Sequence, residues 1–373
     1  MIYLDYSANT PADPAVLRTF VETEQRYIGN ANSTHAAGRA AHARMDEILA
    51  HTAQLLGAQP DELIFTSGAS EANNLALKGM ARASRHVGKH IISTALEHSS
   101  VSGTLTALQE RGYEIDLVDI DREGRVDLEH LRELMRKDTV MVAMCAVDSE
   151  LGTVQPLAEI AEIVKQAPDC RLHVDATQAV GKMPVSFDGI DTMSIAPHKF
   201  YGLNGCGILV KRKGVILEPL IHGGASTTIY RSGTPALALA ASMETALQLA
   251  LEQLPKRQAV VQAWNNLLRE RLSAYPEVRI NSPKQAIPHI LNLSVRGVKG
   301  AAFQQALDAK GVCVSVKSAC SVENTPSRAV FAVSHDRKTA MSSWRISLSH
   351  LTTQNDIDGF LSAFEACYKE LTK

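Results

Sequence analysis

The feature that most constrains this chain is a regular alternation of short apolar runs with amphipathic helical patterns. Helical spacing covers Ala40–Leu56, Glu71–Ser84, Ser102–Arg111 and Leu157–Gln166. The apolar runs have the length of strands and span Glu62–Thr66, His90–Thr94, Glu114–Asp119, Thr139–Val147, Arg171–Val174, Thr192–Ile195 and Gly207–Val210. This alternation is typical of a mostly parallel sheet wrapped by helices. We therefore predict an α/β fold with a large domain built on a mostly parallel seven-stranded sheet.

The pattern changes after a long helical segment, Pro235–Leu254, which is expected to end at Pro255. Beyond it the sequence predicts a mixed series of elements: helix Gln258–Ala274, strand Ile290–Ser294, helix Gly300–Lys310, strand Val312–Val316 and a final helix from about Gln354. We therefore expect a large domain over residues 13–250. A smaller α+β domain would comprise residues 1–12 and 251–373.

Composition excludes several classes of protein. The net charge of −2 gives no electrostatic reason for binding nucleic acid or an anionic membrane. No apolar run is long enough to span a bilayer, and the opening residues Met1–Tyr6 lack the pattern of a signal peptide. The six cysteines are scattered without metal-ligand spacing, so no metal site is expected. A reduced, cytoplasmic setting fits these features best.

Two side chains that can take part in catalysis, a carboxylate and an amine, follow neighbouring apolar runs. Asp175 ends the run Arg171–Val174, and Lys199 follows Thr192–Ile195. In an open α/β sheet, the carboxyl ends of strands border the crevice that binds ligands. A lysine can hold pyridoxal phosphate (PLP) as a Schiff base, and a carboxylate can keep its pyridine nitrogen protonated. Taken alone, such a pair is more often a strand-end aspartate and a loop lysine that never meet.

Three further segments end at the same edge of the predicted sheet. The segment Thr66–Asn74 follows a strand and opens a helix, an arrangement that can bind a phosphate through backbone amides or can be an ordinary helix cap. His98 follows the strand His90–Thr94, where an imidazole can stack on a ring and move protons, although a lone histidine there is more often structural. Asp148 and Ser149 follow the strand Thr139–Val147.

Together, seven segments in register resemble the cysteine desulfurases, which are class V aminotransferase-like enzymes of PLP fold-type I. The similarity extends in order from Ile2 to about residue 360. The segments are Tyr3–Ala8, Phe65–Glu71, Glu97-His98, His173–Gln178, His198-Lys199, Arg231–Pro235 and Ser318-Ala319-Cys320. The resemblance implies a PLP enzyme that converts L-cysteine to L-alanine, works as a homodimer and passes sulfur to an unidentified acceptor protein.

The resemblance also assigns roles to individual residues. Lys199 would carry PLP, Asp175 would pair with the pyridinium nitrogen, and Gln178 would hydrogen-bond the ring oxygen. His98 would stack on the ring and is a plausible proton carrier. The remaining assignments are Ala69, Ser70 and His198 at the phosphate, Thr234 from a second subunit at the same phosphate, Ser149 beside the cofactor and Arg345 at the substrate carboxylate. Without the resemblance, Arg345 would be read as a surface arginine at a strand edge.

Cys320 separates this group from plain aminotransferases. The resemblance implies that its thiolate attacks the substrate sulfur and becomes a persulfide, and nearby Lys317 would favour the thiolate. The alternative is an idle surface thiol. A polar stretch of sequence follows Cys320 in the long span that separates it from Arg345. Long loops are usually functional or mobile.

The chain departs from the family pattern at several positions. Asp148 and Ser149 stand where paired asparagines are usual, and Ser149 is the shorter side chain at the position that touches the cofactor. Ala196 replaces a phosphate-binding serine, while Pro197 and Lys317 replace glycines. These changes leave three alternatives open beside the desulfurase: a selenocysteine lyase, a class V aminotransferase, and a degenerate paralogue that acts as a scaffold or regulatory partner.

Overall fold

The large sheet has seven strands in the order β2-β8-β7-β6-β5-β3-β4. The computed structural model describes residues 1–224, 228–316 and 325–372. Neighbouring strands are parallel from β4 through β7, whereas β8 is antiparallel to both β7 and β2. The strands are β2 (Leu63–Thr66), β3 (His90–Ser93), β4 (Glu114–Leu117), β5 (Thr139–Cys145), β6 (Arg171–Asp175), β7 (Thr192–Ile195) and β8 (Gly207–Lys211). The predicted mostly parallel sheet is confirmed.

Two separate cores cover the two faces of this sheet because side chains alternate along a strand. In β5, Met141 and Ala143 belong to the core that contains residues of α3 (Ala69–Ala83) and α4 (Ser99–Gln109). Val142 and Met144 belong to the opposite core, with residues of α6 (Leu157–Val164) and α7 (Leu237–Glu252). The continuous apolar run in β5 is therefore explained by burial on both faces.

Several helices differ from the sequence expectation. Pro255 does not end a helix: α7 stops at Glu252, and Pro255 lies in the first turn of α8 (Leu254–Leu272), where a missing amide hydrogen costs nothing. The expected single helix Pro235–Leu254 and its neighbour are thus joined almost directly at Gln253. Two helices of the large-sheet region, α1 (Pro14–Arg26) and α5 (Leu128–Leu134), were not expected, and α2 (Ala36–Leu56) starts four residues before the expected Ala40.

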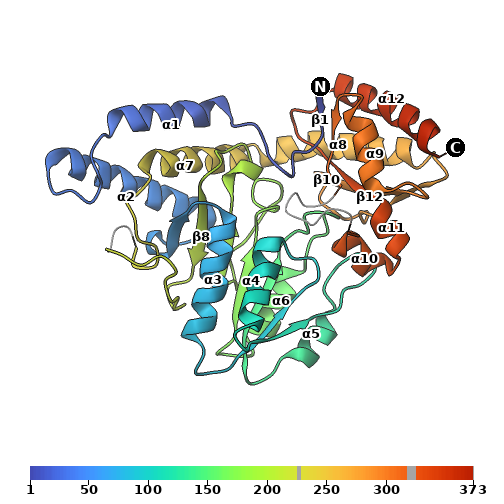
Figure 1. Ribbon diagram of the computed structural model, residues 1–373. Coiled ribbons are helices and arrows are strands. Elements are labelled where there is room, and N and C mark those ends of the chain that lie inside the picture. Colours follow the sequence, from blue (N-terminus) through green and yellow to red (C-terminus); the bar gives the residue numbers. More distant parts are fainter. Residues whose placement is uncertain (225–227, 317–324, 373) are drawn as a thin grey trace.

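A smaller sheet with its own core lies beside the large one, at the upper right of Figure 1. Trp344 and Phe303 stack there with ring centroids 5.1 Å apart. Its antiparallel strands run in the order β12 (Ser343–Ser347), β10 (Ile290–Val295) and β9 (Val278–Ile280). The helices of this part after α8 are α9 (Gly300–Asp308), α10 (Arg328–Ser334), α11 (Arg337–Ser342) and α12 (Gln354–Leu371).

The strand predicted over Val312–Val316 is wrong in length. β11 contains only Val312–Cys313, which pairs in parallel with β1 (Ile2–Tyr3). Two residues later Ser315 forms an isolated antiparallel bridge with Arg345 instead of continuing the ladder. Ser315 is thereby held against β12.

The first residues of the chain connect the two sheets. β1 joins β11, and Asp5 bridges Ser347 of the small sheet. A few residues later, the amide of Thr10 donates to the carbonyl of His198 over 3.0 Å, at the edge of the large sheet. This path is consistent with an N-terminal segment that belongs to the smaller domain. The division at residues 12 and 250 stays a prediction. Within the described part of the chain, no helix is long and apolar enough to cross a membrane.

Candidate active site

A cavity of about 390 Å³ lies where β5, β6 and β7 end. Its wall contains Cys145, the last residue of β5, and Asp175, the last of β6. Nearly all the site residues predicted from the sequence line it: Ala69, Ser70, His98, Ser149, Asp175, Gln178, His198, Lys199 and Arg345. The lining also includes residues to which the sequence assigned no role, among them Ser7, Ala8, Leu96 and Thr177.

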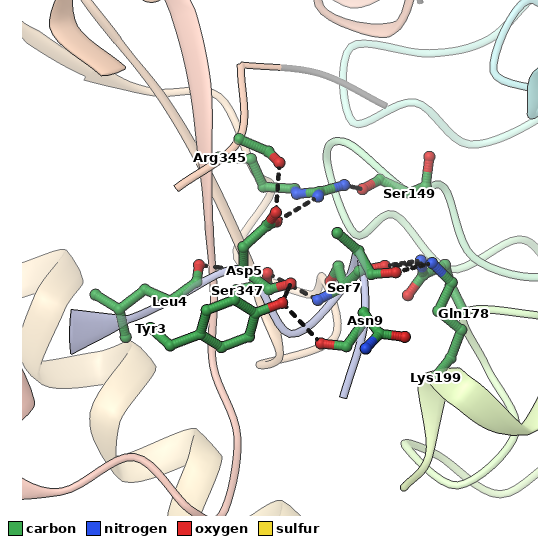
Figure 2. A network of polar contacts seen from close by, with 12 residues as sticks. Tyr3, Leu4, Asp5, Ser7, Asn9, Ser149, Gln178, Lys199, Arg345 and Ser347 are labelled. Carbon is green, nitrogen blue, oxygen red and sulfur yellow. Dashed lines mark hydrogen bonds and ion pairs between the residues drawn. The ribbon is translucent and has the colours of Figure 1, made fainter. Parts of the chain in front are cut away.

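Lys199 lies in a short 3₁₀ turn, Pro197–Lys199, directly after β7. Its Nζ donates to the carbonyl oxygens of Ser7 over 2.8 Å and of Ala8 over 2.6 Å (Figure 2). The N-terminal segment therefore passes over the lysine and orients its amine inside the cavity. Only the folded chain brings residues 7 and 199 together, so this contact could not be predicted from the sequence.

Asp175 is buried at the end of β6, and both of its carboxylate oxygens accept hydrogen bonds. Oδ1 accepts from the amide of Thr177 at 3.0 Å, and Oδ2 accepts from Nδ2 of Asn73 at 2.8 Å. Asn73 is fully buried on α3, and its Oδ1 lies 3.0 Å from Nε2 of His173. This arrangement fixes a negative charge at the back of the cavity.

His98 caps the N-terminus of α4, where its Nδ1 accepts from the amide of Ser100 at 3.2 Å. The Oγ of Ser100 also lies 2.9 Å from this nitrogen. Burial lowers the pKa of His98, and the positive charges of Lys199 and Arg328 lower it further, against the opposing effect of Asp175. The imidazole is therefore neutral at neutral pH.

The start of α3 forms one end of the cavity, where Ala69 and Ser70 expose the first turn of the helix. Close backbone packing shapes this end: a Cβ on Gly207 would lie 2.6 Å from the carbonyl carbon of Gly68. His198 lines the same cavity, and burial, together with Lys199 and Lys182, lowers its pKa to about 4. A helix N-terminus beside a neutral imidazole can bind an anion through N–H donors.

Gln178 links the lysine region to a second, buried lysine that the sequence did not single out. Its Nε2 donates to the carbonyl of Ser7 over 3.0 Å, and its Oε1 accepts from Nζ of Lys182. Burial lowers the pKa of Lys182 well below its usual value, and the charges of Lys199 and Arg345 act in the same direction. Lys182 stands four residues after Gln178, but no periodic pattern marked it as facing the site.

Arg345 lies in β12 and is only 2% exposed, so it is not a surface arginine. Its Nη2 pairs with Oδ1 of Asp5 at 2.9 Å, and its Nη1 donates to the carbonyl of Ser149 over 2.6 Å (Figure 2). The other oxygen of Asp5 accepts from Oγ of Ser315 at 2.8 Å. Ser149 thus contacts Arg345 through its backbone carbonyl, and Ser149 also lines the cavity.

Two predicted site residues, Thr234 and Cys320, are not among the described residues that line this cavity. Thr234 is exposed just before α7 and does not line the cavity of its own chain. Its assignment to the phosphate of a second subunit stays a prediction. Cys320 and Lys317 lie outside the described residues.

The residues present fit PLP. The cavity combines a lysine, a buried carboxylate and an anion-binding helix start, which are the groups that this cofactor needs. Three buried polar atoms at the cavity have no hydrogen-bond partner within the described part of the protein: Ser7 Oγ, Thr177 Oγ1 and Arg345 Nε. Buried polar atoms normally have partners, so these unpaired groups point to a polar ligand. No group of three histidine, cysteine or acidic side chains among the described residues is arranged to hold a metal ion.

Comparisons with known proteins agree with this geometry. The family model "Aminotransferase class-V" matches residues 2–360. The curated "Cysteine desulfurase IscS" of Dictyoglomus turgidum is 36% identical over 99% of this chain and 95% of that protein. A solved "NIFS-LIKE PROTEIN" superposes with a TM-score of 0.92 at 32% identity, covering 100% of this chain and 99% of that one. A structure titled "SspA in complex with cysteine" superposes with a TM-score of 0.82 at 29% identity, covering 95% of this chain and 100% of that one. The chain therefore belongs to the class V aminotransferase family, and within that PLP-dependent family to the cysteine desulfurases.

Proposed function

We propose that this protein is a PLP-dependent cysteine desulfurase that converts L-cysteine to L-alanine and transfers the sulfur to an acceptor. The observation that carries the proposal is the meeting of Lys199, Asp175 and Arg345 at one cavity. A lysine, a buried carboxylate and a buried guanidinium serve, respectively, to hold the cofactor, to tune its ring and to bind an amino-acid carboxylate. The similarity to a protein named as a cysteine desulfurase, and to a structure titled as a complex with cysteine, supports the same substrate.

The cofactor would be held by residues from several elements. Lys199 would carry it covalently, Asp175 would pair with its ring nitrogen, and His98 would lie against its ring. The ring oxygen would be bound by Gln178 and Ser149, and the phosphate by Ala69, Ser70 and His198. When bound, PLP supplies an electron sink for the negative charge that develops on the substrate.

The protein side chains then act in sequence. Arg345 binds and orients the carboxylate of L-cysteine, and Nζ of Lys199 removes the α-proton. The thiolate of Cys320 attacks the substrate sulfur, so that an S–S bond forms and the C–S bond breaks. The electron pair of the broken bond stays with the β-carbon, which takes up a proton, and the α-carbon regains the proton that Lys199 removed, so that L-alanine forms. Sulfur remains as a persulfide on Cys320, and no external oxidant is required.

Substitution of Cys320 tests this sequence. We expect Cys320→Ser to bind L-cysteine and exchange its α-proton with solvent, but to release no alanine catalytically, because an alcohol is a poor nucleophile toward sulfur. Cys313→Ser, on β11, is the matched control and should retain turnover. In the unsubstituted protein, L-cysteine without an acceptor should leave one persulfide on Cys320, detected by mass spectrometry. Alanine and sulfide production by Cys320→Ser at the normal rate would favour a lyase or an aminotransferase instead.

We further propose a cytoplasmic homodimer in which Thr234 of one subunit completes the phosphate site of the other. Its exposed position just before α7 supports a role outside its own cavity. Mixing Lys199→Ala subunits with Thr234→Ala subunits would then create one intact site in each heterodimer. Activity above that of either parent is the expected result, whereas no recovery would mean that each site is built within one chain.

The sulfur acceptor would be the protein that becomes persulfidated in a pull-down with the enzyme that carries the persulfide.

A further inference from the structure

A chain of hydrogen-bonded side chains runs through the large sheet behind the cavity. It begins at Thr192 on β7, whose Oγ1 lies 2.9 Å from Nδ1 of His173 on β6. Nε2 of His173 lies 3.0 Å from Oδ1 of Asn73, and Nδ2 of Asn73 lies 2.8 Å from Oγ of Ser100. Oγ of Ser100 is in turn 2.9 Å from Nδ1 of His98. The two middle links bring together β6, α3 and α4, so the chain depends on the fold.

The carboxylate of Asp175 sets the direction of these hydrogen bonds. A carboxylate only accepts, so the atom of Asn73 that faces it at 2.8 Å is the NH₂ group. The amide oxygen of Asn73 must then accept from Nε2 of His173, which carries the proton of that ring. Nδ1 of His173 is left as an acceptor for the hydroxyl of Thr192. Burial lowers the pKa of His173 to about 4, in agreement with a neutral ring.

The other end of the chain fixes the protonation of His98. The second N–H of Asn73 donates to Oγ of Ser100, which leaves the hydroxyl proton of Ser100 for Nδ1 of His98. The backbone amide of Ser100 also donates to Nδ1 over 3.2 Å. A backbone N–H cannot accept a hydrogen bond, so Nδ1 of His98 carries no proton. The single proton of the neutral ring lies on Nε2.

We propose that Asn73 is a positioning residue that, through Ser100, locks His98 in the neutral tautomer with its proton on Nε2, so that His98 does not shuttle protons during the reaction. In this tautomer Nε2 has no lone pair to accept a proton from the substrate. Protonation at Nδ1 would place its N–H against the backbone N–H of Ser100, which cannot accept a hydrogen bond, and would force the hydroxyl of Ser100 to turn its proton away. The inference rests on the proposed desulfurase activity, and it leaves Lys199 as the base for the α-proton.

The charged groups around His98 support the neutral ring. Lys199 and Arg328 disfavour an imidazolium, and among the charged groups of the described residues that act on it Asp175 alone favours it. Desolvation is the largest effect and acts against the cation, so the pKa of His98 is lowered overall. The locked tautomer and the electrostatic environment therefore act in the same direction.

Nitrogen NMR of the holoenzyme with ¹⁵N-labelled histidine reads the tautomer directly, and His98→Gln assigns the signal. We expect an unprotonated Nδ1 and a protonated Nε2, unchanged across neutral pH. A ring that carries its proton on Nδ1, or a cationic ring at neutral pH, would overturn the proposal. Because this readout needs no turnover, it stays informative even if the protein does not desulfurate L-cysteine.

Substitutions test whether the chain of hydrogen bonds is responsible. Ser100→Ala keeps the backbone amide but removes the hydroxyl link to Asn73, and we expect the NMR signals of His98 to become pH-dependent near neutrality. Asn73→Ala should do the same where it folds, and Thr106→Ala, at an exposed position of α4, is the control with unchanged signals. Unchanged signals in Ser100→Ala would assign the lock to the amide alone and exclude Asn73 from it.

Kinetics of α-proton exchange with L-cysteine separate the two roles of His98. His98→Gln retains an N–H but has no basic nitrogen, so the rate should fall by only about ten-fold from the lost ring contact. Loss of a general acid–base group typically costs about 10²- to 10⁴-fold. A fall of that size with cofactor still bound would restore His98 as a proton carrier. Absence of exchange in the unsubstituted protein would instead refute the proposed activity, with the tautomer still measurable.

Discussion

Two walls of the cavity are built on different physical principles. The back wall is Asp175, supported from behind by Asn73 and His173, and all three belong to the large sheet or to α3 that covers it. The opposite wall pairs Arg345 of the small sheet with Asp5 of the N-terminal segment and with the backbone of Ser149. The back wall holds one charge among neutral donors, whereas the opposite wall holds two opposite charges in contact.

This difference matches the ligands that each wall would bind. The back wall is fixed by strand register, since Asp175 stands between Cys145 of β5 and Ser194 of β7, and it suits a cofactor that stays bound. At the other wall, Asp5 already occupies one side of the Arg345 guanidinium. A substrate carboxylate must share Arg345 with Asp5 or replace it, which suits a ligand that enters and leaves in every cycle.

The largest effect should come from Lys199, which lies between the two walls. Lys199→Met removes the amine that holds the cofactor and takes the α-proton, so we expect turnover to fall by at least about 10⁴-fold, the upper end for loss of an acid–base group. PLP held by Lys199 should make the purified protein yellow, and Lys199→Met should lack this colour. Lys211→Met, a buried lysine of β8, is the matched control and should stay yellow. Borohydride labelling of the native protein at a lysine other than Lys199 would contradict the assignment.

Breaking the back wall should have the next largest effect. Asp175→Asn removes the fixed negative charge and sets an amide against the NH₂ group of Asn73, so we expect turnover to fall by about 10²- to 10³-fold, as for loss of one preorganised electrostatic group. Cofactor binding should weaken as well, measured by equilibrium dialysis. Asp191→Asn is the control, because Asp191 accepts from the amide of Leu172 at the other end of β6. Near-normal turnover in Asp175→Asn would show that the wall does not tune the cofactor.

Changes at the opposite wall should alter KM more than kcat. Arg345→Lys loses the forked geometry, and we expect KM for L-cysteine to rise by about 10- to 100-fold, the value of a charge-assisted hydrogen bond. Asp5→Asn removes the competing charge but keeps a hydrogen-bond acceptor for Ser315, so KM should fall by a few-fold, roughly the effect of a modest electrostatic interaction. Steady-state kinetics of both variants check this. A rise of KM in Asp5→Asn would mean that Asp5 mainly orients Arg345.

The sequence predicted the back wall better than the opposite wall, for a physical reason. Asp175 and Lys199 each follow a recognisable buried strand, and the ends of parallel strands meet at one edge. Their chemistry could therefore be placed together once the strands were recognised. The family resemblance added Arg345, which no pattern of periodicity would have brought to the cavity.

Contacts between distant segments could not be predicted in this way. Asp5 reaches Arg345 only because β1 pairs with β11, and Asn73 reaches His173 only because α3 packs on the centre of the sheet. The amide of Asn73 was visible in the motif that starts α3, yet its partners depend on sheet register. Pro255 was misread as a helix end because proline suits both the first turn of a helix and the residue after one.

The smallest expected effect concerns Glu97, a second buried carboxyl near the back wall. Its Oε1 accepts from Oγ1 of Thr94 at 2.8 Å and from the amide of Cys145 at 3.0 Å. Its Oε2 is buried without a partner among the described residues. Burial, with a contribution from the charge of Asp175, raises the pKa of Glu97 from 4.5 to about 8. The folded protein therefore needs Glu97 to remain protonated.

The raised pKa predicts the sign of a pH effect on stability. The stabilisation from protonated Glu97 is complete below pH 4.5 and is lost as pH rises through about 8. Between these values, one extra bound proton in the folded state lowers the free energy of unfolding by up to about 1.4 kcal/mol per pH unit. Glu97→Gln mimics the protonated group. Its free energy of unfolding should therefore rise relative to that of the unsubstituted protein by up to the same amount per pH unit. Urea unfolding of both proteins at matched pH measures the difference in free energy of unfolding, and other titrating groups, such as Asp148 with its pKa near 7, largely cancel in this difference.

Glu62→Gln is the control: both oxygens of Glu62 accept from backbone amides, so its replacement should destabilise the protein at every pH. A gap between Glu97→Gln and the unsubstituted protein that stays constant from acid to mild alkali would mean that Glu97 is ionised in the fold, and that the back wall holds two negative charges instead of one.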